Sequence, residues 1–320
     1  MKLVVMIPAY NEENSLPLVI KEIPRKIEGI AKVEVLVIDD GCSDKTVEVA
    51  LKAGADRIIH HTRNKGLAPS FSDGLEEALR MGADIIVNTD ADFQYNQAEI
   101  PRIIKPIMDK KADIVLTDRN VSSLPHMPFG KKLGNALSSW VTRRVSGFPV
   151  HDAQSGYRAF SKEAALKLNV LADYTYVQET IIQANYKKLK IVQVPCEFRK
   201  RQGKSRLIAN IFNYAKRAGM TIITTYTQYK PLKVFLAIGG TLFLLGLMLG
   251  LTVIRNYLTT GQVSPHLPTA ILSGFLIIIG FQVALLGIIA DTIKANRMVQ
   301  EQILYKMKKH EIDEINYSRE

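Results

Sequence analysis

Apolar and polar positions alternate along the first two thirds of the chain in a way that predicts strands and helices in turn. Short runs rich in Val and Ile, typical of buried strands, are separated by longer segments with apolar residues at helical spacing. The predicted strands are 2–7, 33–38, 57–60, 85–88, 113–117 and 191–198, and the predicted helices are 15–27, 44–53, 69–81, 98–109, 130–145, one from Lys162, and 180–187. This order predicts an α/β fold, a Rossmann-like, mostly parallel sheet with helices on both faces.

The pattern changes after Thr227. The segments Val234–Ile254 and Pro268–Ala290 contain no charged residue, and each is long enough to cross a bilayer core, for which roughly 20 helical residues suffice. We therefore predict two transmembrane helices, the alternative being a pair of buried core helices. Before them, Leu207–Tyr229 alternates apolar and basic residues at helical spacing, which predicts helices lying in the membrane interface.

These patterns predict four regions. They are a cytosolic α/β domain at 1–206, interface helices at 207–230, two transmembrane helices at 231–290 and a cytosolic tail at 291–320. Lys and Arg lie on both outer sides of the spans, whereas the connecting loop 255–267 carries only Arg255. By the positive-inside rule, the α/β domain and both termini of this multi-pass membrane protein are expected in the cytoplasm. No cleaved signal peptide is expected, because Met1 leads directly into a strand.

Composition narrows the class of partner. The 320 residues carry a formal net charge of +11, but the basic residues cluster near position 200 and beside the spans, where lipid headgroups and phosphates are the nearer explanation. No nucleic-acid-binding motif accompanies them, so nucleic acid is not an expected partner. Two cysteines, Cys42 and Cys196, lie in unrelated contexts without metal-ligand spacing. So few cysteines exclude a disulfide framework, which suits a reducing compartment.

Polar motifs follow the predicted strands at the points where the strands end. Asp90 and Asp92 come directly after the strand 85–88. Ligands of open parallel sheets bind at the carboxyl ends of the strands, and carboxylate oxygens are the ligands that Mg²⁺ takes together with phosphate oxygens. Taken alone, an Asp-x-Asp string is as readily a solvated strand end. The other strand-end motifs at 8–12, 39–44 and 64–66 favour a ligand site.

Four sequence motifs, three of them at these strand ends, together resemble glycosyltransferase family 2. They are PAYNEE at 8–13, VIDDGCSD at 37–44, DADFQ at 90–94 and DAQSGYR at 152–158. Within that family the chain looks most like the polyprenyl-phosphate glycosyltransferases, such as dolichyl-phosphate mannose synthases and undecaprenyl-phosphate glucosyltransferases. The resemblance covers roughly residues 2–207 and implies a fold of the GT-A type, followed by interface and membrane helices.

The resemblance implies a donor site for a nucleotide-sugar, either a GDP-hexose or a UDP-hexose. A carboxylate can accept a hydrogen bond from a base, and an aromatic ring can cover the base or the ribose. Lys65 and Gly66 add a cation and a loop that a phosphate can approach closely, although a plain turn explains them equally well. The donor-binding residues expected are Pro8, Tyr10, Glu12, Ile38, Asp40, Lys65, Gly66, Asp90, Ala91 and Glu179.

The same resemblance implies a metal-dependent enzyme. Asp92 and Gln94 are the expected ligands of Mg²⁺ or Mn²⁺, and the metal would act as a Lewis acid on the diphosphate. The catalytic residues expected are Asp90, Asp92, Asp152 and Arg158. For Asp152, a general-base role and an orienting role toward Gln154, Arg158 or a sugar hydroxyl both remain open. Glu179 either binds a sugar hydroxyl or favours the start of its helix.

The acceptor is expected to be polyprenyl or dolichyl phosphate. A phosphate monoester has a second pKa of about 6, so it is largely ionised near neutrality and needs positive charges for positioning more than a strong base. The expected acceptor-phosphate residues are Arg119, Lys131, Lys132 and Arg201. In the basic loop 199–206 we prefer Arg201 to Lys200, because a guanidinium grips phosphate with two hydrogen bonds. The alternative is that this loop only contacts anionic lipid headgroups.

The sequence thus predicts inverting transfer of a hexose, mannose or glucose, to polyprenyl phosphate at the cytosolic membrane face. Two alternatives remain: a processive polysaccharide synthase, and a non-catalytic scaffold that binds nucleotide-sugars. The chain lacks the Gln-x-x-Arg-Trp string of processive synthases. Gln282 lies in the second apolar span, where an unpaired amide is costly, so we expect it to hydrogen-bond to a neighbouring helix or to another protomer. A homo-oligomer is therefore expected. The identity of the sugar and of the nucleotide stays open.

Overall fold

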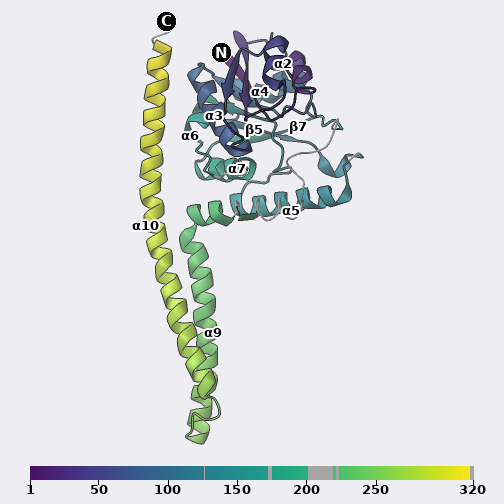
Figure 1. Ribbon diagram of the computed structural model, residues 1–320. Coiled ribbons are helices and arrows are strands. Elements are labelled where there is room, and N and C mark those ends of the chain that lie inside the picture. The colour runs from purple at the N-terminus through teal and green to yellow at the C-terminus, as the bar shows by residue number, and fades with distance from the viewer. Residues whose placement is uncertain (126, 172–174, 201–218, 221–222, 318–320) are drawn as a thin grey trace. The chain divides into compact units, whose positions relative to one another are not determined.

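The computed structural model describes residues 1–125, 127–171, 175–200, 219–220 and 223–317 (Figure 1). By internal contacts the chain divides into two compact units. We call them the sheet unit, Met1–Ile223 with Leu304–Glu320, and the hairpin unit, Thr224–Ile303. The expected boundary at residue 206 and most of the expected interface helices at 207–230 lie outside the described residues.

A seven-stranded sheet forms the centre of the sheet unit, in the order β3-β2-β1-β4-β6-β5-β7. All neighbouring strands are parallel except β6, which is antiparallel to both β4 and β5. The strands are β1 (Lys2–Ala9), β2 (Lys32–Asp39), β3 (Arg57–His60), β4 (Ile85–Asn88), β5 (Ile114–Asp118), β6 (Arg158–Ser161) and β7 (Ile191–Pro195). The expected mostly parallel α/β sheet is confirmed.

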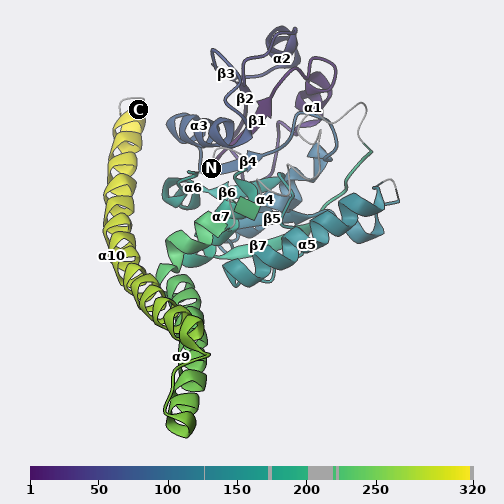
Figure 2. The same ribbon diagram turned by 60° about the horizontal axis from the view of Figure 1, so that its bottom comes forward.

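Helices cover both faces of the sheet, as Figure 2 shows. They are α1 (Leu16–Glu22), α2 (Thr46–Ala53), α3 (Leu67–Arg80), α4 (Ile100–Met108), α5 (Phe129–Ser146), α6 (Lys162–Lys167) and α7 (Val177–Tyr186), with short 3₁₀ turns η1 (Gln97–Glu99) and η2 (Val121–Ser123). Alternate side chains of β1 enter opposite cores, because successive strand residues point to opposite faces. Leu3 and Val5 pack with α1 and α4, whereas Val4 and Met6 pack with α3.

Two elements differ from the sequence expectation. The helix expected over 15–27 ends at Glu22, because Ile23 precedes Pro24 and a residue before proline is disfavoured in the α conformation. Strand β6 was not expected, since its four residues include Arg158 and show no clear alternation. Pairing with β4 and β5 on either side, which sequence periodicity does not reveal, makes this segment a strand.

The hairpin unit contains α9 (Pro231–Thr260) and the first part of α10 (Leu267–Tyr317). Both helices are long and apolar enough to cross a membrane, and only 11% and 17% of their most apolar windows are buried. Such low burial argues against a pair of buried core helices. Gly239 and Gly280 face each other: a Cβ at Gly239 would lie 2.5 Å from the Gly280 carbonyl oxygen. Small residues therefore let the two backbones approach closely.

Candidate functional site

The polar motifs meet at one edge of the sheet because β1, β2 and β4 are parallel neighbours whose carboxyl ends coincide. The loop after β1 is bound to the loop after β2 at two points. Glu12 N–H donates to the Thr46 hydroxyl at 2.9 Å, and Ser43 N–H donates to the Asn11 side chain at 2.8 Å. The edge is therefore a hydrogen-bonded platform built from the first two motifs.

Asp40 joins this platform to the loop after β3. Its buried carboxylate accepts the backbone N–H groups of Lys65 and Gly66 at 2.8 and 2.9 Å, and His61 Nδ1 lies 2.9 Å away. Gly66 has a φ of +98°, a conformation that suits glycine. The Lys65 ammonium pairs with Asp73 at 3.0 Å. Asp40 thus holds the loop that carries two other expected donor residues.

The remaining residues expected to bind the nucleotide-sugar at this edge differ in their exposure to solvent. Tyr10 is 41% exposed, which leaves its ring on the surface where a base could stack. Glu12 accepts the Ser15 hydroxyl at 2.7 Å. Pro8 is paired in register with Ile38, and Ile38 is fully buried. Ile38 therefore shapes the floor of the site from the core.

The Asp90–Gln94 motif lies at the end of β4. Its Asp90 carboxylate sits above Gly156, where a Cβ would lie 2.9 Å from Asp90 Oδ1. Asp92 Oδ1 accepts the Gln94 N–H at 3.2 Å, and Ala91 is buried beneath the loop. Any residue larger than glycine at 156 would displace the carboxylate, so the fourth motif supports the third.

Gln94 connects this motif to the start of the basic loop. The Arg199 N–H donates to the Gln94 carbonyl at 2.7 Å, and Gln94 Nε2 donates to the Arg199 carbonyl at 3.2 Å. The Arg199 guanidinium lies 4.8 Å from the Phe93 ring centre and pairs with Glu22 at 2.8 Å. Arg199 is thus engaged within the fold, and Arg201, the preferred acceptor residue, lies outside the described residues.

The side chains at this edge can be assessed as ligands for a metal ion. Among the residues that the structure describes, no group of three or more His, Cys, Asp and Glu side chains is arranged to hold a metal ion. Mg²⁺ is commonly held by only one or two carboxylates, with waters and substrate phosphates completing its shell. The half-buried Asp90 and Asp92, with the amide oxygen of Gln94, fit that kind of substrate-completed site.

Asp152 and Arg119 form a buried ion pair beside this edge. Arg119 donates from Nε to Asp152 Oδ2 at 2.6 Å and from Nη2 to Oδ1 at 2.9 Å. Burial by itself would raise the pKa of Asp152, but the charge and hydrogen bonds of Arg119 hold that pKa below its usual value. An ionised carboxylate in such a pair is a weak proton acceptor, so the arrangement favours the orienting role for Asp152.

Arg158 is fully buried. Its guanidinium donates to the carbonyls of Ser155, Ala153 and Val177 at 2.8, 3.1 and 2.7 Å, and to the Thr180 hydroxyl at 2.7 Å. Burial lowers the pKa of Arg158 to about 10. Its position lets it act on a substrate only through the 152–156 loop, which it fastens to α7.

The other expected residues lie on the helices around this loop. Glu179 is buried at the start of α7 and accepts the Leu171 N–H at 3.1 Å and the Gln183 amide at 2.9 Å. Lys131 is exposed in the first turn of α5, and the Lys132 ammonium donates to the Ser122 carbonyl at 2.9 Å. Glu179 thus fastens the 168–171 loop, whereas the two lysines lie at one end of α5.

Sequence reasoning missed two buried residues beneath the site. His61 lies between Asp40 and Asp73, with 2.9 and 3.0 Å separations. Asn88 donates to the Gly156 carbonyl at 2.8 Å and to the Tyr176 hydroxyl at 2.7 Å. A polar residue that ends an otherwise apolar strand was the available signal for Asn88. No sequence signal pointed to His61, because its partners are distant in sequence.

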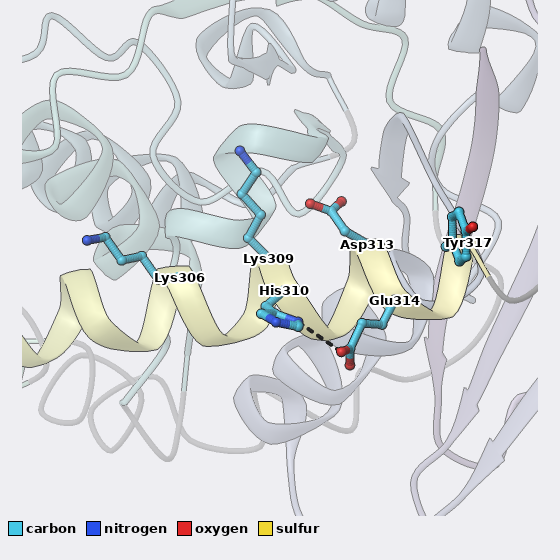
Figure 3. Close-up of a pocket in the computed structure, with 6 residues that line it drawn as sticks. All are labelled: Lys306, Lys309, His310, Asp313, Glu314 and Tyr317. Carbon is cyan, nitrogen blue, oxygen red and sulfur yellow. Dashed lines mark ion pairs between the residues drawn. The ribbon is translucent and has the colours of Figure 1, made fainter.

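A separate hollow lies on α10 and contains none of these residues. Figure 3 shows its lining, which is Lys306, Lys309, His310, Asp313, Glu314 and Tyr317. His310 Nδ1 and Glu314 Oε1 are 3.3 Å apart. All six side chains come from one helix, so this surface does not compete with the strand-end edge as the candidate site.

Both units of the chain match known protein families. The sequence model of Glycosyl transferase family 2 matches residues 4–168, and that of the GtrB C-terminal hairpin matches residues 230–295. The UDP-N-acetylglucosamine–dolichyl-phosphate N-acetylglucosaminyltransferase of Methanococcus voltae is 33% identical over 214 residues, covering 59% of this chain and 82% of that protein. The polyprenol monophosphomannose synthase of Mycolicibacterium smegmatis is 29% identical over 210 residues, covering 62% of this chain and 77% of that protein.

The fold also has relatives among solved structures. Glucosyl-3-phosphoglycerate synthase of Mycobacterium tuberculosis, crystallised with uridine diphosphate, superposes with a TM-score of 0.56 at 20% identity, covering 70% of this chain and 80% of that chain. At this level of identity the likeness concerns the fold alone. It confirms the GT-A type of architecture that the sequence motifs implied.

Proposed function

Because this chain belongs to glycosyl transferase family 2, we propose that it transfers a hexose from a nucleotide-sugar to a polyprenyl phosphate. Relatives named for transfer to dolichyl phosphate and for polyprenol monophosphomannose synthesis support this reaction class. The observation that carries the proposal is the pair of hydrogen bonds between Gln94 and Arg199. They bind the loop suited to a donor diphosphate directly to the first residue of the basic loop.

The donor half of the site takes the nucleotide at the ends of β1 and β2. Tyr10 offers an exposed ring for the base, and Asp40 fixes the loop of Lys65 and Gly66 toward the diphosphate. Pro8, Ile38 and Glu12 shape the same edge. Neither the GDP nor the UDP form of the donor is favoured by these contacts, because a base N–H can be accepted by loop carboxylates in either case.

Asp92 and Gln94 would hold a divalent cation, Mg²⁺ or Mn²⁺. When bound, such an ion offsets the negative charge that builds on the leaving diphosphate. Asp90 and Ala91 then contact the sugar and ribose side of the donor. Glu179 and Arg158 act indirectly. Glu179 holds the 168–171 loop, and Arg158 holds the 152–156 loop.

The acceptor phosphate supplies the nucleophile. One of its oxygens attacks the anomeric carbon as the bond from that carbon to the diphosphate breaks, so a single displacement inverts the configuration and releases the nucleoside diphosphate. Arg119, oriented by Asp152, and Lys131, Lys132 and Arg201 provide the positive charge that positions the phosphate. No strong base is required, because the phosphate is already ionised near neutrality.

The two long apolar helices would anchor the protein as a hairpin, with the sheet unit and both termini in the cytoplasm. In this arrangement residues 1–206 form the cytosolic domain, 207–230 the interface helices, 231–290 the membrane spans and 291–320 the cytosolic tail. A homo-oligomer would give the Gln282 amide a hydrogen-bonding partner.

The proposal is tested by a donor screen on the full chain in membranes. GDP-mannose, UDP-glucose and UDP-N-acetylglucosamine are each supplied with a dolichyl phosphate, and extracted lipid is analysed by mass. We expect one donor to yield a lipid of the mass of a polyprenyl-phosphate sugar, and NMR of that product to show a β linkage. Bound nucleotide-sugar without any glycolipid would instead favour the scaffold, and a polymer product would favour a processive synthase.

A further inference from the structure

Two adjacent histidines lie at the end of β3, and each is close to one carboxylate of the Asp39–Asp40 pair. His60 Nδ1 lies 3.0 Å from Asp39 Oδ2, and the His60 side chain is 61% exposed. His61 Nδ1 lies 2.9 Å from Asp40 Oδ1, and only 2% of the His61 side chain is exposed. The same kind of contact is thus made once at the surface and once in the interior. The buried contact involves Asp40, one of the expected donor-binding residues.

The Asp40 carboxylate is held by three hydrogen bonds from the segment after β3. Its Oδ1 accepts the Lys65 N–H at 2.8 Å as well as the bond from His61 Nδ1, and its Oδ2 accepts the Gly66 N–H at 2.9 Å. An ionised carboxylate only accepts hydrogen bonds, so His61 Nδ1 is the donor of its pair. The three donors together set the direction in which this carboxylate points.

His61 is anchored by the sheet, whereas Lys65 belongs to the loop that Asp40 holds. The His61 N–H donates to the Asp39 carbonyl at 2.9 Å, which continues the pairing of β2 with β3. On the other side of the ring, His61 Nε2 lies 3.0 Å from Asp73 Oδ2 on α3, and the Lys65 ammonium lies 3.0 Å from the same oxygen. His61 therefore connects the sheet to both of the carboxylates that hold Lys65.

The loop after β3 packs directly on the loop after β2. Gly41 has a φ of +74°, and a Cβ there would lie 2.6 Å from the Arg63 carbonyl carbon and 2.7 Å from the Asn64 nitrogen. A site whose loops are already held in place binds its ligand more tightly, because less ordering is required on binding. His61 supplies part of that order from beneath the two loops.

We propose that His61 is a positioning residue for the donor nucleotide. By holding the Asp40 carboxylate, it fixes the loop of Lys65 and Gly66 in the arrangement that binds the nucleoside diphosphate. The buried His61 ring does not touch the donor, so its effect falls on donor affinity and leaves the rate of the chemical step unchanged. This inference rests on the proposed function, to which it adds a residue that the four sequence motifs do not contain.

Two amide variants separate this role from packing. His61→Asn keeps an N–H donor near the position of Nδ1, beside Asp40, whereas His61→Gln carries its amide toward the position of Nε2, beside Asp73. Both variants replace the ring with a neutral amide, so they differ in which carboxylate the amide reaches. His60→Gln is the matched control, because it makes the same substitution at the neighbouring exposed ring.

Binding is measured by calorimetry on the full chain in detergent with Mg²⁺. UDP and GDP are titrated into the wild type, and the diphosphate that binds is used for all variants. We expect His61→Gln to weaken its binding about tenfold, the scale of one lost hydrogen bond to a charged group. We expect His61→Asn to stay within about threefold of the wild type, and His60→Gln to bind as the wild type does.

The transfer assay then divides the effect between KM and kcat. We expect His61→Gln to raise the donor KM by the same factor, with kcat and the acceptor KM unchanged. A lower melting temperature and lower kcat with an unchanged donor KM would show a role in folding alone and overturn the inference. Equal affinities of His61→Asn and His61→Gln would overturn it as well. A wild-type chain that binds neither diphosphate and forms no glycolipid would remove the proposed function, and this inference with it.

Discussion

Under the proposed function, Asp92 is the residue on which binding of the donor diphosphate depends most. Its carboxylate lies at the end of β4 and accepts the Gln94 N–H, so it shapes the loop. In the proposed function the same carboxylate also offers oxygen to a cation. Asparagine keeps the size and one oxygen but removes the charge. The side-chain role in the loop and the role in charge stabilisation can therefore be separated experimentally.

We expect Asp92→Asn to lower kcat by about a hundredfold or more, the scale seen when one preorganised stabiliser of transition-state charge is lost. Its thermal unfolding should match that of the wild type. The measurement is glycolipid formation across a titration of Mg²⁺ and Mn²⁺. Asp109→Asn, at an exposed carboxylate after α4, is the control and should retain the wild-type rate. Wild-type turnover in the Asp92 variant would remove the metal assignment.

The Asp152–Arg119 ion pair makes the free energy of unfolding depend on pH. The folded-state pKa of Asp152 lies below its usual value of about 3.9. Its stabilising contribution is therefore fully present above the unfolded-state pKa and is lost as the pH falls through the folded-state pKa. We expect the free energy of unfolding to decline as the pH drops below about 4, measured by denaturant titration in acid buffers.

Substitution of either partner tests this pair. Arg119→Ala leaves a buried carboxylate without its cation and should cost about 3–5 kcal/mol at neutral pH. Asp152→Asn removes the titrating group and should make the acid part of the stability curve flatter. A curve of unchanged slope in Asp152→Asn would show that other carboxylates dominate the acid sensitivity.

At the scale of elements, the close packing of α9 against α10 depends on glycine. A Cβ at Gly239 would lie 2.5 Å from the Gly280 carbonyl oxygen and 2.8 Å from the Ala284 nitrogen, whereas nothing lies within 4 Å of a Cβ at Gly240. Adjacent residues of one helix thus face opposite surroundings. Leucine at Gly239 or at Gly240 changes the composition and the hydropathy of α9 equally, so the two variants can be compared directly.

We expect Gly239→Leu to force the two helices apart and to lower stability by about 1–3 kcal/mol, the usual cost of overpacking a close contact. Gly240→Leu should have little effect. Both variants are compared by thermal unfolding in detergent, followed by fluorescence of a thiol probe. If the two leucine variants melted alike, the close contact between α9 and α10 would not be what stabilises the hairpin.

At the scale of the whole molecule, the sheet unit is built from two distant stretches of sequence. The last turns of α10 pack on α3 and α6: Ile312 is 3% exposed within the core, and the Tyr305 hydroxyl donates to Glu163 at 3.1 Å. Arg80 pairs with Glu311 at 3.2 Å. The segment expected to be a tail thus contributes a buried side chain to the fold of the sheet unit.

We expect Ile312→Asp to destabilise the sheet unit by about 2–5 kcal/mol, because it removes buried apolar surface and introduces a carboxylate into the core. Met307→Asp is the control on the same helix, since Met307 is 64% exposed. Limited proteolysis of the full chain measures the effect, with faster cleavage expected only for Ile312→Asp. Equal cleavage of the two variants would mean that the C-terminal segment is not part of the folded unit.

Much of this organisation was predictable from local sequence. The Val- and Ile-rich runs predicted most of the strands, the placement of polar motifs after them predicted the site edge, and the charge-free segments predicted the two long helices. The predictions of the strands and of the two long helices succeed because strand alternation, helical spacing, and the length and apolar character of a segment are properties of short stretches of sequence. The order of the motifs was enough to indicate the family.

Other features depended on residues brought together only by folding. Sequence alone could not show that Arg158 would be enclosed by the carbonyls of Ala153, Ser155 and Val177, or that Asp40 would hold the loop after β3. Nor could it show which face of α5 turns outward, because an apolar stripe predicts burial in a soluble protein. Periodicity determined that these elements exist. Tertiary packing decided which side chains remain exposed, because burial depends on contacts between segments far apart in the chain.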